Sequence, residues 1–299
     1  MCVVDLKLPI LVNKKLKFAN VIGLLLLLSF VSFSHLAFAN KQQRIVALSP
    51  HLVEILFDLG VGEQIVGALE FSDHPIAAQS IPRIGGAQGI NIEKLIALEP
   101  DIVFVWQGGN QAKDIEQIKR LGFNLVFSNP KQLFDLADEI NHFGKVLNLE
   151  TKAQEVTKKY VTRLSKLQNT YADQRAVNVF YQLWPEPLMT INGSTWINQL
   201  LTVCGANNVF STNSSPYPQV GIENVIKAQP EVIIVPAQHD RMKEIESSEQ
   251  TLFWQQWPEI PAVNKNNFII VNADLLHRNT PRMLLGLEPL CQQIHKFRN

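Results

Sequence analysis

The side chains that could recognise a ligand lie in short loops where aromatic residues stand beside glycine or proline. Trp106 precedes Gly108 and Gly109, whose missing side chains let backbone approach a ligand closely. Proline restrains the other aromatic loops, and the run 274–278 adds polar groups. This combination suits a large, flat or partly apolar ligand, although any one aromatic at a strand end could simply cap the core. The segments are Phe71-Ser72-Asp73-His74-Pro75, Trp184-Pro185-Glu186-Pro187, Ser215-Pro216-Tyr217-Pro218 and Asp274-Leu275-Leu276-His277-Arg278.

Catalytic and metal chemistry are weakly indicated. After residue 39 the sequence has no nucleophile elbow, phosphate-binding loop, His-Glu-x-x-His or Cys-x-x-Cys motif. Its histidines are scattered, with no pair four residues apart on one predicted helix. His51, His74 and His277 fall at the predicted ligand loops, where an axial bond to a metallo-macrocycle competes with a simpler hydrogen-bonding or surface role. We predict a binding protein that is not an enzyme and has no catalytic residue, bound metal or cofactor, with an exported hydrolase as the alternative class.

Apolar segments with strand character alternate with helical segments along the chain. This alternation predicts an α/β fold with mostly parallel sheets covered by helices. A long amphipathic helix over 150–171 separates two such regions. The predicted strands are 44–48, 64–68, 101–106, 123–127, 177–183, 232–235 and 268–271, and the other predicted helices are 50–59, 91–98, 112–121, 196–203, 225–228 and 282–296.

The second region repeats the first. Residues 91–106 align without gaps on residues 221–236, and in both a short helix opens with Ile-Glu, ends at a proline and leads through an acid into a buried strand. We therefore expect two similar lobes, 40–148 and 175–299, joined by one rigid helix within 149–174. A cleft between such lobes is a usual place for a ligand.

The repeat also places one carboxylate at the same position of each lobe. Glu93 and Glu223 fall in the first turn of their helices, where the helix dipole stabilises an acid. That effect suffices to explain a single glutamate. The duplicated pair additionally matches what a two-fold symmetric partner could recognise through two arginines.

Composition and the N-terminus indicate an exported globular protein. The 299 residues carry 27 Lys+Arg against 27 Asp+Glu and are 46% hydrophobic, which argues against a disordered chain or an electrostatic nucleic-acid binder. Four lysines precede an apolar run over 21–31, and Ala37-Phe38-Ala39 follows it. This pattern predicts a signal peptide over 1–39 cleaved before Asn40, and the competing interpretation is an uncleaved membrane anchor.

Two cysteines, Cys204 and Cys291, remain after this predicted cleavage. An even count in an oxidising compartment favours a disulfide, and two buried free thiols are the alternative.

Several of these motifs occur together in a known order. The sequence resembles the periplasmic cobalamin-binding proteins of vitamin B12 ABC importers, which are class III periplasmic binding proteins, over essentially the whole chain after residue 39. The motifs that carry the resemblance, besides the Phe71 and Asp274 loops, are Leu48-Ser49-Pro50, Asn91-Ile92-Glu93, Leu98-Glu99-Pro100-Asp101, Trp106-Gln107-Gly108-Gly109-Asn110, Val203-Cys204-Gly205, Pro218-Gln219-Val220 and Pro281-Arg282.

The resemblance implies a monomeric periplasmic protein that closes little on its ligand. It implies that Glu93 and Glu223 dock on arginines of a membrane permease dimer, and that Cys204 pairs with Cys291. It implies that a corrinoid is held between the lobes by a set of eight residues: Phe71, Trp106, Tyr217, Asp274, Leu275, Leu276, His277 and Arg278.

The sequence departs from that family at the aromatic positions. Ala87 and Tyr217 stand where the family has tryptophan, and Phe71 stands where a tyrosine is usual. A related cobamide with another lower base is therefore compatible with the sequence. The alternative ligand is haem or a ferric siderophore, favoured by the cleft histidines and the missing tryptophan.

Overall fold

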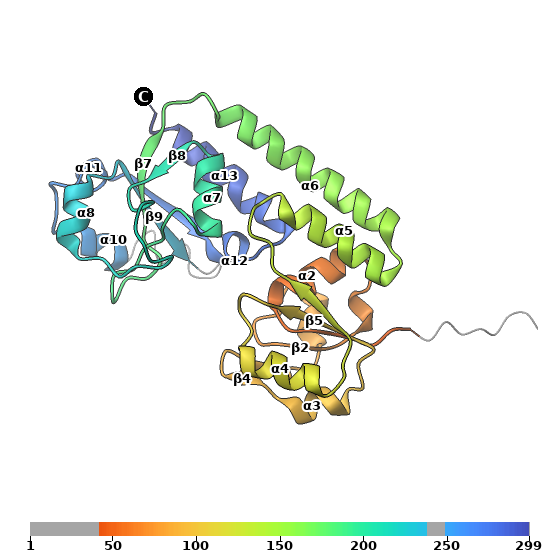
Figure 1. Ribbon diagram of the computed structural model, residues 1–299. Coiled ribbons are helices and arrows are strands. Elements are labelled where there is room, and N and C mark those ends of the chain that lie inside the picture. The colour runs from red at the N-terminus through yellow and green to blue at the C-terminus, as the bar shows by residue number, and fades with distance from the viewer. Residues whose placement is uncertain (1–41, 238–248, 299) are drawn as a thin grey trace, which may run out of the picture. The chain divides into compact units, whose positions relative to one another are not determined.

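In a computed structural model that describes residues 42–237 and 249–298, two parallel four-stranded sheets with the same strand order form the framework. Figure 1 shows the ribbon with its elements labelled. The first sheet has the order β2-β1-β5-β6, with strands Ile65–Ala68, Ile45–Ala47, Ile102–Trp106 and Leu125–Ser128. The second has the order β8-β7-β9-β10, with strands Ala206–Asn208, Val177–Tyr181, Val232–Ala237 and Phe268–Asn272. The predicted fold of two similar α/β lobes is confirmed. The predicted signal peptide over 1–39 lies outside the described residues.

In both sheets, the acid that follows the repeated proline accepts a backbone hydrogen bond from the neighbouring strand or the residue just before it. Asp101 precedes β5, and its Oδ2 accepts a hydrogen bond from the backbone N–H of Arg44 at 2.8 Å, just before β1. Glu231 precedes β9, and its Oε2 accepts from the backbone N–H of Asn178 in β7 at 2.9 Å. The helices before these acids are α3 (Ile92–Ala97) and α8 (Ile222–Ala228). The duplicated carboxylates thus align each central strand with its neighbour.

Both faces of each sheet are buried, as expected for parallel strands covered by helices. In β1, Ile45 and Ala47 belong to the largest apolar cluster, whereas Val46 between them packs in a separate cluster with residues of α3 and α4 (Ala112–Arg120). In β9, Val232 and Ile234 face the same large cluster, and Ile233 packs with α8 and α10 (Glu249–Trp254) on the other side. The largest core therefore continues from one sheet to the other.

Three helices carry this shared core between the lobes. Helix α6 (Glu150–Tyr171), with the predicted bounds, packs along α5 (Asp135–Leu147), and both contribute buried residues to it. Tyr160 on α6 is buried and donates from its hydroxyl to the Leu133 carbonyl oxygen at 2.7 Å. Arg163 pairs with Glu288 of α13 (Leu284–His295), with 2.8 Å between Nη2 and Oε1. The connecting helix is thus fixed to both neighbours along its length.

Shorter elements complete the lobes. They include α2 (Pro50–Asp58), which begins at the predicted Ser49-Pro50 step, and a two-stranded antiparallel hairpin of β3 and β4 that the sequence analysis did not predict. Helix α5 was not predicted either, and the C-terminal helix begins two residues later than expected because a 3-10 turn precedes it. The remaining bounds are η1 Gly62–Gln64, η2 Ile76–Ser80, β3 Gly85–Gly86, β4 Gly89–Ile90, α7 Trp196–Val203, α11 Pro261–Asn264, α12 Ala273–Leu276 and η4 Pro281–Met283.

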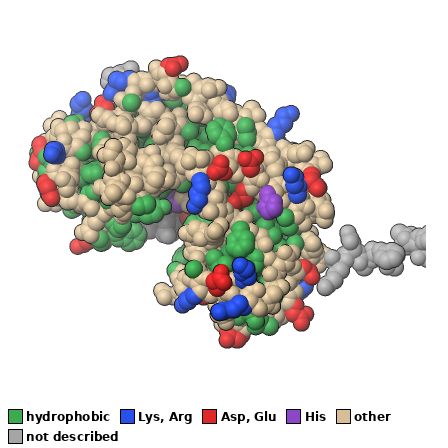
Figure 2. All heavy atoms as spheres, in the orientation of Figure 1, with side chains coloured by type: hydrophobic (Ala, Val, Ile, Leu, Met, Phe, Trp, Pro, Cys, Tyr) green, Lys and Arg blue, Asp and Glu red, His purple; other side chains and the backbone are tan. Residues whose placement is uncertain are grey.

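Trp254 and Trp257 pack together in an apolar cluster of the second lobe. Trp254 is fully buried between Phe180 and Trp257, and its Nε1 donates to Gln182 Oε1 at 2.6 Å. On the face shown in Figure 2, acidic and basic side chains are interspersed. None of the helices within 42–237 and 249–298 combines the length and apolarity needed to cross a bilayer.

The predicted disulfide is present. Cys204, at the C-terminal end of α7, is bonded to Cys291 of α13, and both residues are fully buried. Their separation of 87 residues means that the bond closes most of the second lobe into one loop.

Replacing both cysteines by serine should lower the free energy of unfolding. A cross-link over a loop of this length stabilises by roughly 4 to 5 kcal/mol in the chain-entropy model, because it restricts the unfolded chain. Urea unfolding of the Cys204→Ser, Cys291→Ser variant measures the loss, and wild-type protein unfolded in reductant should match the variant. An unchanged midpoint under oxidising conditions would contradict this expectation.

Candidate functional site

Two of the predicted ligand residues line one cavity of about 250 Å³ in the first lobe. Trp106 ends β5, and Phe71 lies in the loop after β2. The rest of the wall is mostly apolar and includes Ala87, which occupies the tip of the β3–β4 hairpin. The other lining residues are Leu48, Ser49, Pro50, Leu69, Glu70, Gly86, Gly89, Ile90, Gly109, Asn110, Gln111 and Asp114.

The loop after Trp106 holds the indole in place. The Trp106 backbone N–H donates to Asn110 Oδ1 at 2.8 Å, and Asn110 Nδ2 donates to the Leu48 carbonyl oxygen at 2.7 Å. A Cβ atom at Gly109 would collide with the six-membered ring of Trp106, so glycine is required there. The two glycines therefore make room for the Trp106 side chain of their own loop.

A buried polar chain packs against the other side of Trp106. The His51 ring meets the indole edge-on with 5.2 Å between centroids, and its nitrogens bond the hydroxyls of Ser49 and Ser128. Ser128 Oγ in turn donates to Glu139 Oε1 at 3.0 Å. Burial lowers the pKa of His51 to about 4 and raises that of Glu139 to about 7, because in each case it disfavours the charged form. His51 is thus a neutral, hydrogen-bonded core residue.

The run 274–278 divides between a second cavity and the core. Asp274, Leu275 and Arg278 line a cavity of about 410 Å³ together with Asp73 and His74 of the first lobe. Leu276 is fully buried in the large core and lines neither cavity. The Nε2 atom of His277 is hydrogen-bonded to the Tyr181 hydroxyl at 2.8 Å.

Tyr217 lies apart from both cavities. It is 53% exposed in the loop that joins β8 to α8 and lines neither of the two. Arg278 joins the two groups of predicted residues, because its Nη2 donates to the carbonyl oxygen of Phe71 at 3.1 Å.

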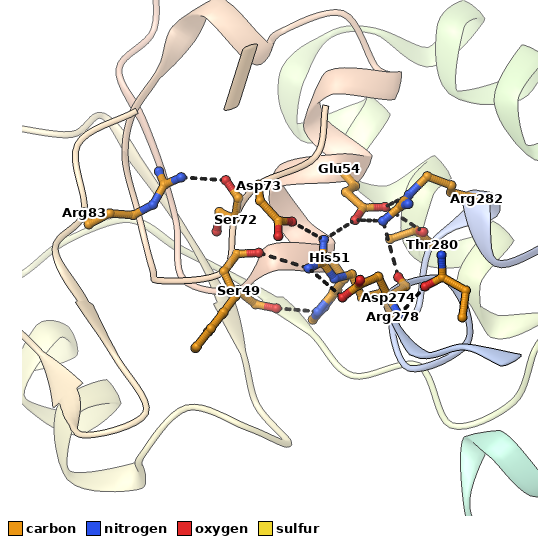
Figure 3. Close-up of polar contacts among 12 residues, drawn as sticks. Ser49, His51, Glu54, Ser72, Asp73, Arg83, Asp274, Arg278, Thr280 and Arg282 are labelled. Carbon is orange, nitrogen blue, oxygen red and sulfur yellow. Dashed lines mark hydrogen bonds and ion pairs between the residues drawn. The ribbon is translucent and has the colours of Figure 1, made fainter. Parts of the chain in front are cut away.

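A buried carboxylate organises the segment that contains Arg278, as Figure 3 shows. Glu54 of α2 has a side chain only 3% exposed, and it accepts hydrogen bonds from Arg278 Nη1 at 2.8 Å and from Thr280 Oγ1 at 3.0 Å. Arg282 adds two bonds, from Nε at 2.8 Å and from Nη2 at 2.6 Å. One acid of the first lobe thus anchors three residues of the second.

The charges in this cluster stabilise one another. Burial alone would raise the pKa of Glu54, but the hydrogen bonds and charges of Arg282 and Arg278 outweigh it and lower the pKa below its ordinary value. Arg278 also bonds Asp73 at 2.8 Å between Nη1 and Oδ1, and these contacts raise its pKa against the effect of burial. Glu54 and Arg278 therefore remain charged near neutral pH.

The two predicted docking carboxylates are exposed on their separate lobes. Glu93 lies in the first turn of α3 and Glu223 in the first turn of α8, as predicted.

The sequence analysis missed Glu54 and Thr280 as site residues. The available signal at Glu54 was a single acid within the apolar helical run Leu52-Val53-Glu54-Ile55-Leu56, which requires a buried cationic partner. Nothing in the local sequence indicates which arginines supply it. Among the described residues, no group of three or more His, Cys, Asp or Glu side chains is arranged to hold a metal ion.

Both the sequence and the fold match known proteins. A family profile described as "Periplasmic binding protein" matches residues 45–275, and the chain belongs to this family. The vitamin B12-binding protein of Vibrio parahaemolyticus is 33% identical over 268 residues, which cover 89% of this chain and 94% of the relative. That of Photorhabdus laumondii is 32% identical over 282 residues, covering 94% and 98%.

Solved structures agree with the sequence relatives. The crystal structure of the periplasmic vitamin B12 binding protein of Vibrio cholerae has a TM-score of 0.78 at 32% identity and covers 86% of this chain and 98% of that one. The periplasmic haem-binding protein from Roseiflexus shares the fold, with a TM-score of 0.75 at 19% identity over 87% of this chain and all of the other. The predicted family and its class III fold are confirmed.

Replacing Glu54 by glutamine should destabilise the protein by about 3–5 kcal/mol, because it leaves Arg278 and Arg282 without their buried carboxylate. Glu54 has a lowered pKa in the folded state, so its stabilisation is complete above its ordinary pKa of 4.5 and is lost as the pH falls through the folded value. Urea unfolding at pH 7 and below pH 4 should show the wild-type advantage shrinking in acid.

The matched control is Glu155→Gln. Glu155 also pairs with two cations, Lys152 and Lys159, but on the exposed surface of α6, where solvent screens the pairing. This variant should unfold close to wild type. Equal losses of unfolding free energy in the two variants would mean that burial gives the Glu54 cluster no more stability than an exposed ion pair provides.

Proposed function

We propose that this protein captures cobalamin in the periplasm and delivers it to an ABC importer. The observation that carries the proposal is the similarity to vitamin B12-binding proteins, which is above 30% identity and spans nearly their whole length. The site supports the same ligand class. A corrinoid has a broad flat ring with amide groups around its edge, and the chain offers an apolar cavity in one lobe beside charged and polar groups of the other.

The proposed contacts divide by chemistry. Phe71 and Trp106 supply apolar faces from the first lobe, and Tyr217 and Leu275 supply them from the second. Asp274 and Arg278 hydrogen-bond amides at the ring edge. His277 contributes through its exposed edge, and the buried Leu276 contributes by supporting its neighbours.

The rest of the proposal follows the same family. Residues 1–39 direct export and are removed, the lobes span 40–148 and 175–299, and the helix within 149–174 joins them. The protein acts as a monomer without enzyme activity, and cobalamin is its cargo.

The buried His51, bonded at both ring nitrogens, cannot serve as an axial haem ligand without leaving its partners. His51 therefore gives no support to the haem alternative.

Calorimetric titration with cyanocobalamin should give tight one-to-one binding, with haem binding far more weakly. Trp106→Ala should weaken the affinity by about 30-fold, as expected for an aromatic residue at the centre of a binding surface. The control is Phe253→Ala, which removes a half-exposed aromatic ring that packs against Trp257 instead. Heat from haem and none from cyanocobalamin would refute the proposed ligand.

Charge reversal at the two docking carboxylates should separate binding from transport. The variant Glu93→Arg, Glu223→Arg should bind cobalamin with nearly unchanged affinity and support no uptake by vesicles that contain the cognate importer, because each lobe would then repel a permease arginine. The variant Glu116→Arg, Glu259→Arg makes the same charge change at other exposed positions, one in each lobe, and should transport normally. Loss of uptake in both variants would show that overall charge, rather than these two sites, governs docking.

A further inference from the structure

Phe71 adopts a backbone conformation that bulky side chains rarely occupy. Its φ angle is +63°, in the left-handed region, which is unfavourable for an ordinary L-residue because the Cβ atom then crowds the backbone. Its ring is 69% exposed although it forms part of the wall of the first-lobe cavity. A costly conformation that displays an apolar ring persists only where the surrounding contacts impose it.

The chain before Phe71 is held by backbone pairing. The Ala68 N–H donates to the Pro82 carbonyl oxygen at 3.0 Å, and the Glu70 N–H donates to that of Gly85 at 2.8 Å. Residue 70 is therefore fixed beside the β3–β4 hairpin. The Phe71 backbone is thus held on its N-terminal side, and its remaining restraints must come from the residues that follow it and from contacts with its own carbonyl.

Arg83 holds the chain after Phe71 through three backbone carbonyl oxygens. Its Nη2 donates to Ser72 at 2.6 Å and to Ala78 at 3.1 Å, and its Nη1 donates to Ile81 at 2.6 Å. Figure 3 shows the guanidinium directed at the Ser72 carbonyl, on the side of the loop away from the Glu54 cluster. A planar guanidinium can make such a fork, and a lysine ammonium cannot reproduce it.

Phe71 itself is held from the other lobe. Arg278 donates to its carbonyl oxygen, so two successive carbonyls, those of Phe71 and Ser72, meet two different guanidinium groups. Arg278 is committed to Glu54 and Asp73 as well, whereas the Arg83 guanidinium donates to Ser72, Ala78 and Ile81, all of which lie between Phe71 and Arg83 in the chain. Arg83 is thus the contact dedicated to the loop that carries Phe71.

We propose that Arg83 is a positioning residue for ligand capture, which keeps Phe71 in its left-handed conformation so that the ring stays at the cavity. This inference rests on the proposed function for its ligand. It adds a residue that lines neither of the two described cavities and affects affinity through Phe71 alone.

A double-mutant cycle tests the proposal with cyanocobalamin as the probe. Arg83→Met should weaken binding by about 10-fold in the wild-type background, close to the effect of Phe71→Ala, and by less than about 2-fold once Phe71 is already alanine. Arg83→Lys should fall between wild type and Arg83→Met. Arg44→Met is the control, because Arg44 also bonds a backbone carbonyl, that of Leu98 at 2.9 Å, in the same lobe.

A ligand-free measurement covers the case in which the ligand assignment fails. Hydrogen exchange of the full protein should show faster deuterium uptake over residues 69–74 in Arg83→Met and Arg83→Lys, and wild-type uptake there in Arg44→Met. If wild type binds no corrinoid, the proposed function fails, and this exchange result alone decides whether Arg83 orders the loop.

Three results would overturn the positioning role. One is unchanged affinity in Arg83→Met. Another is an equal loss of affinity in the presence and absence of the Phe71 ring, which would indicate general damage. The third is unchanged exchange over 69–74 in both Arg83 variants.

Discussion

One buried carboxylate, that of Glu54, organises the contact between the two lobes beside the cavity that both of them line. Glu54 is almost fully enclosed, so its charge must be compensated, and its hydrogen bonds come from Arg278, Thr280 and Arg282. These bonds bring the segment after β10 against helix α2 of the other lobe. Arg278 then lies where it can reach Asp73 and the Phe71 carbonyl as well. The cavity lined by both lobes lies beside this contact, and Arg278 belongs to both.

Much of the framework could be predicted because its signals are local. The gapless repeat predicted two similar lobes, and the bounds of α6 followed from its polar and apolar periodicity. Helix α5 has a comparable pattern, although it was not predicted. Four apolar residues recur at helical spacing in it and are all buried: Leu136, Ile140, Phe143 and Leu147. The β3–β4 hairpin has only two residues in each strand, too few for any periodic pattern to appear.

The site was predictable only in part, for a physical reason. Phe71 and Trp106 follow parallel strands of one sheet, so their loops meet at its carboxyl edge and share a cavity. Glu54 and its partners are separated by 224 to 228 residues, and only tertiary packing brings them together. Residues 274–278 were predicted to form one ligand-binding surface. In the structure, helix α12 directs the Leu276 side chain into the core.

The position of Glu54 in the chain sets an order of assembly. Strands β1, β2, β5 and β6 come from the first 128 residues and can pair as soon as these are available. Helix α2 then carries an acid whose arginine and threonine partners are among the last residues of the chain to be made. Until residues 278–282 pack against α2, full burial of this helix would leave the Glu54 carboxylate in the core without a partner. Docking of the segment 278–282, just before the C-terminal helix, therefore completes the first half of the protein as well as the second, and a chain that ends before residue 278 lacks every one of these partners of Glu54.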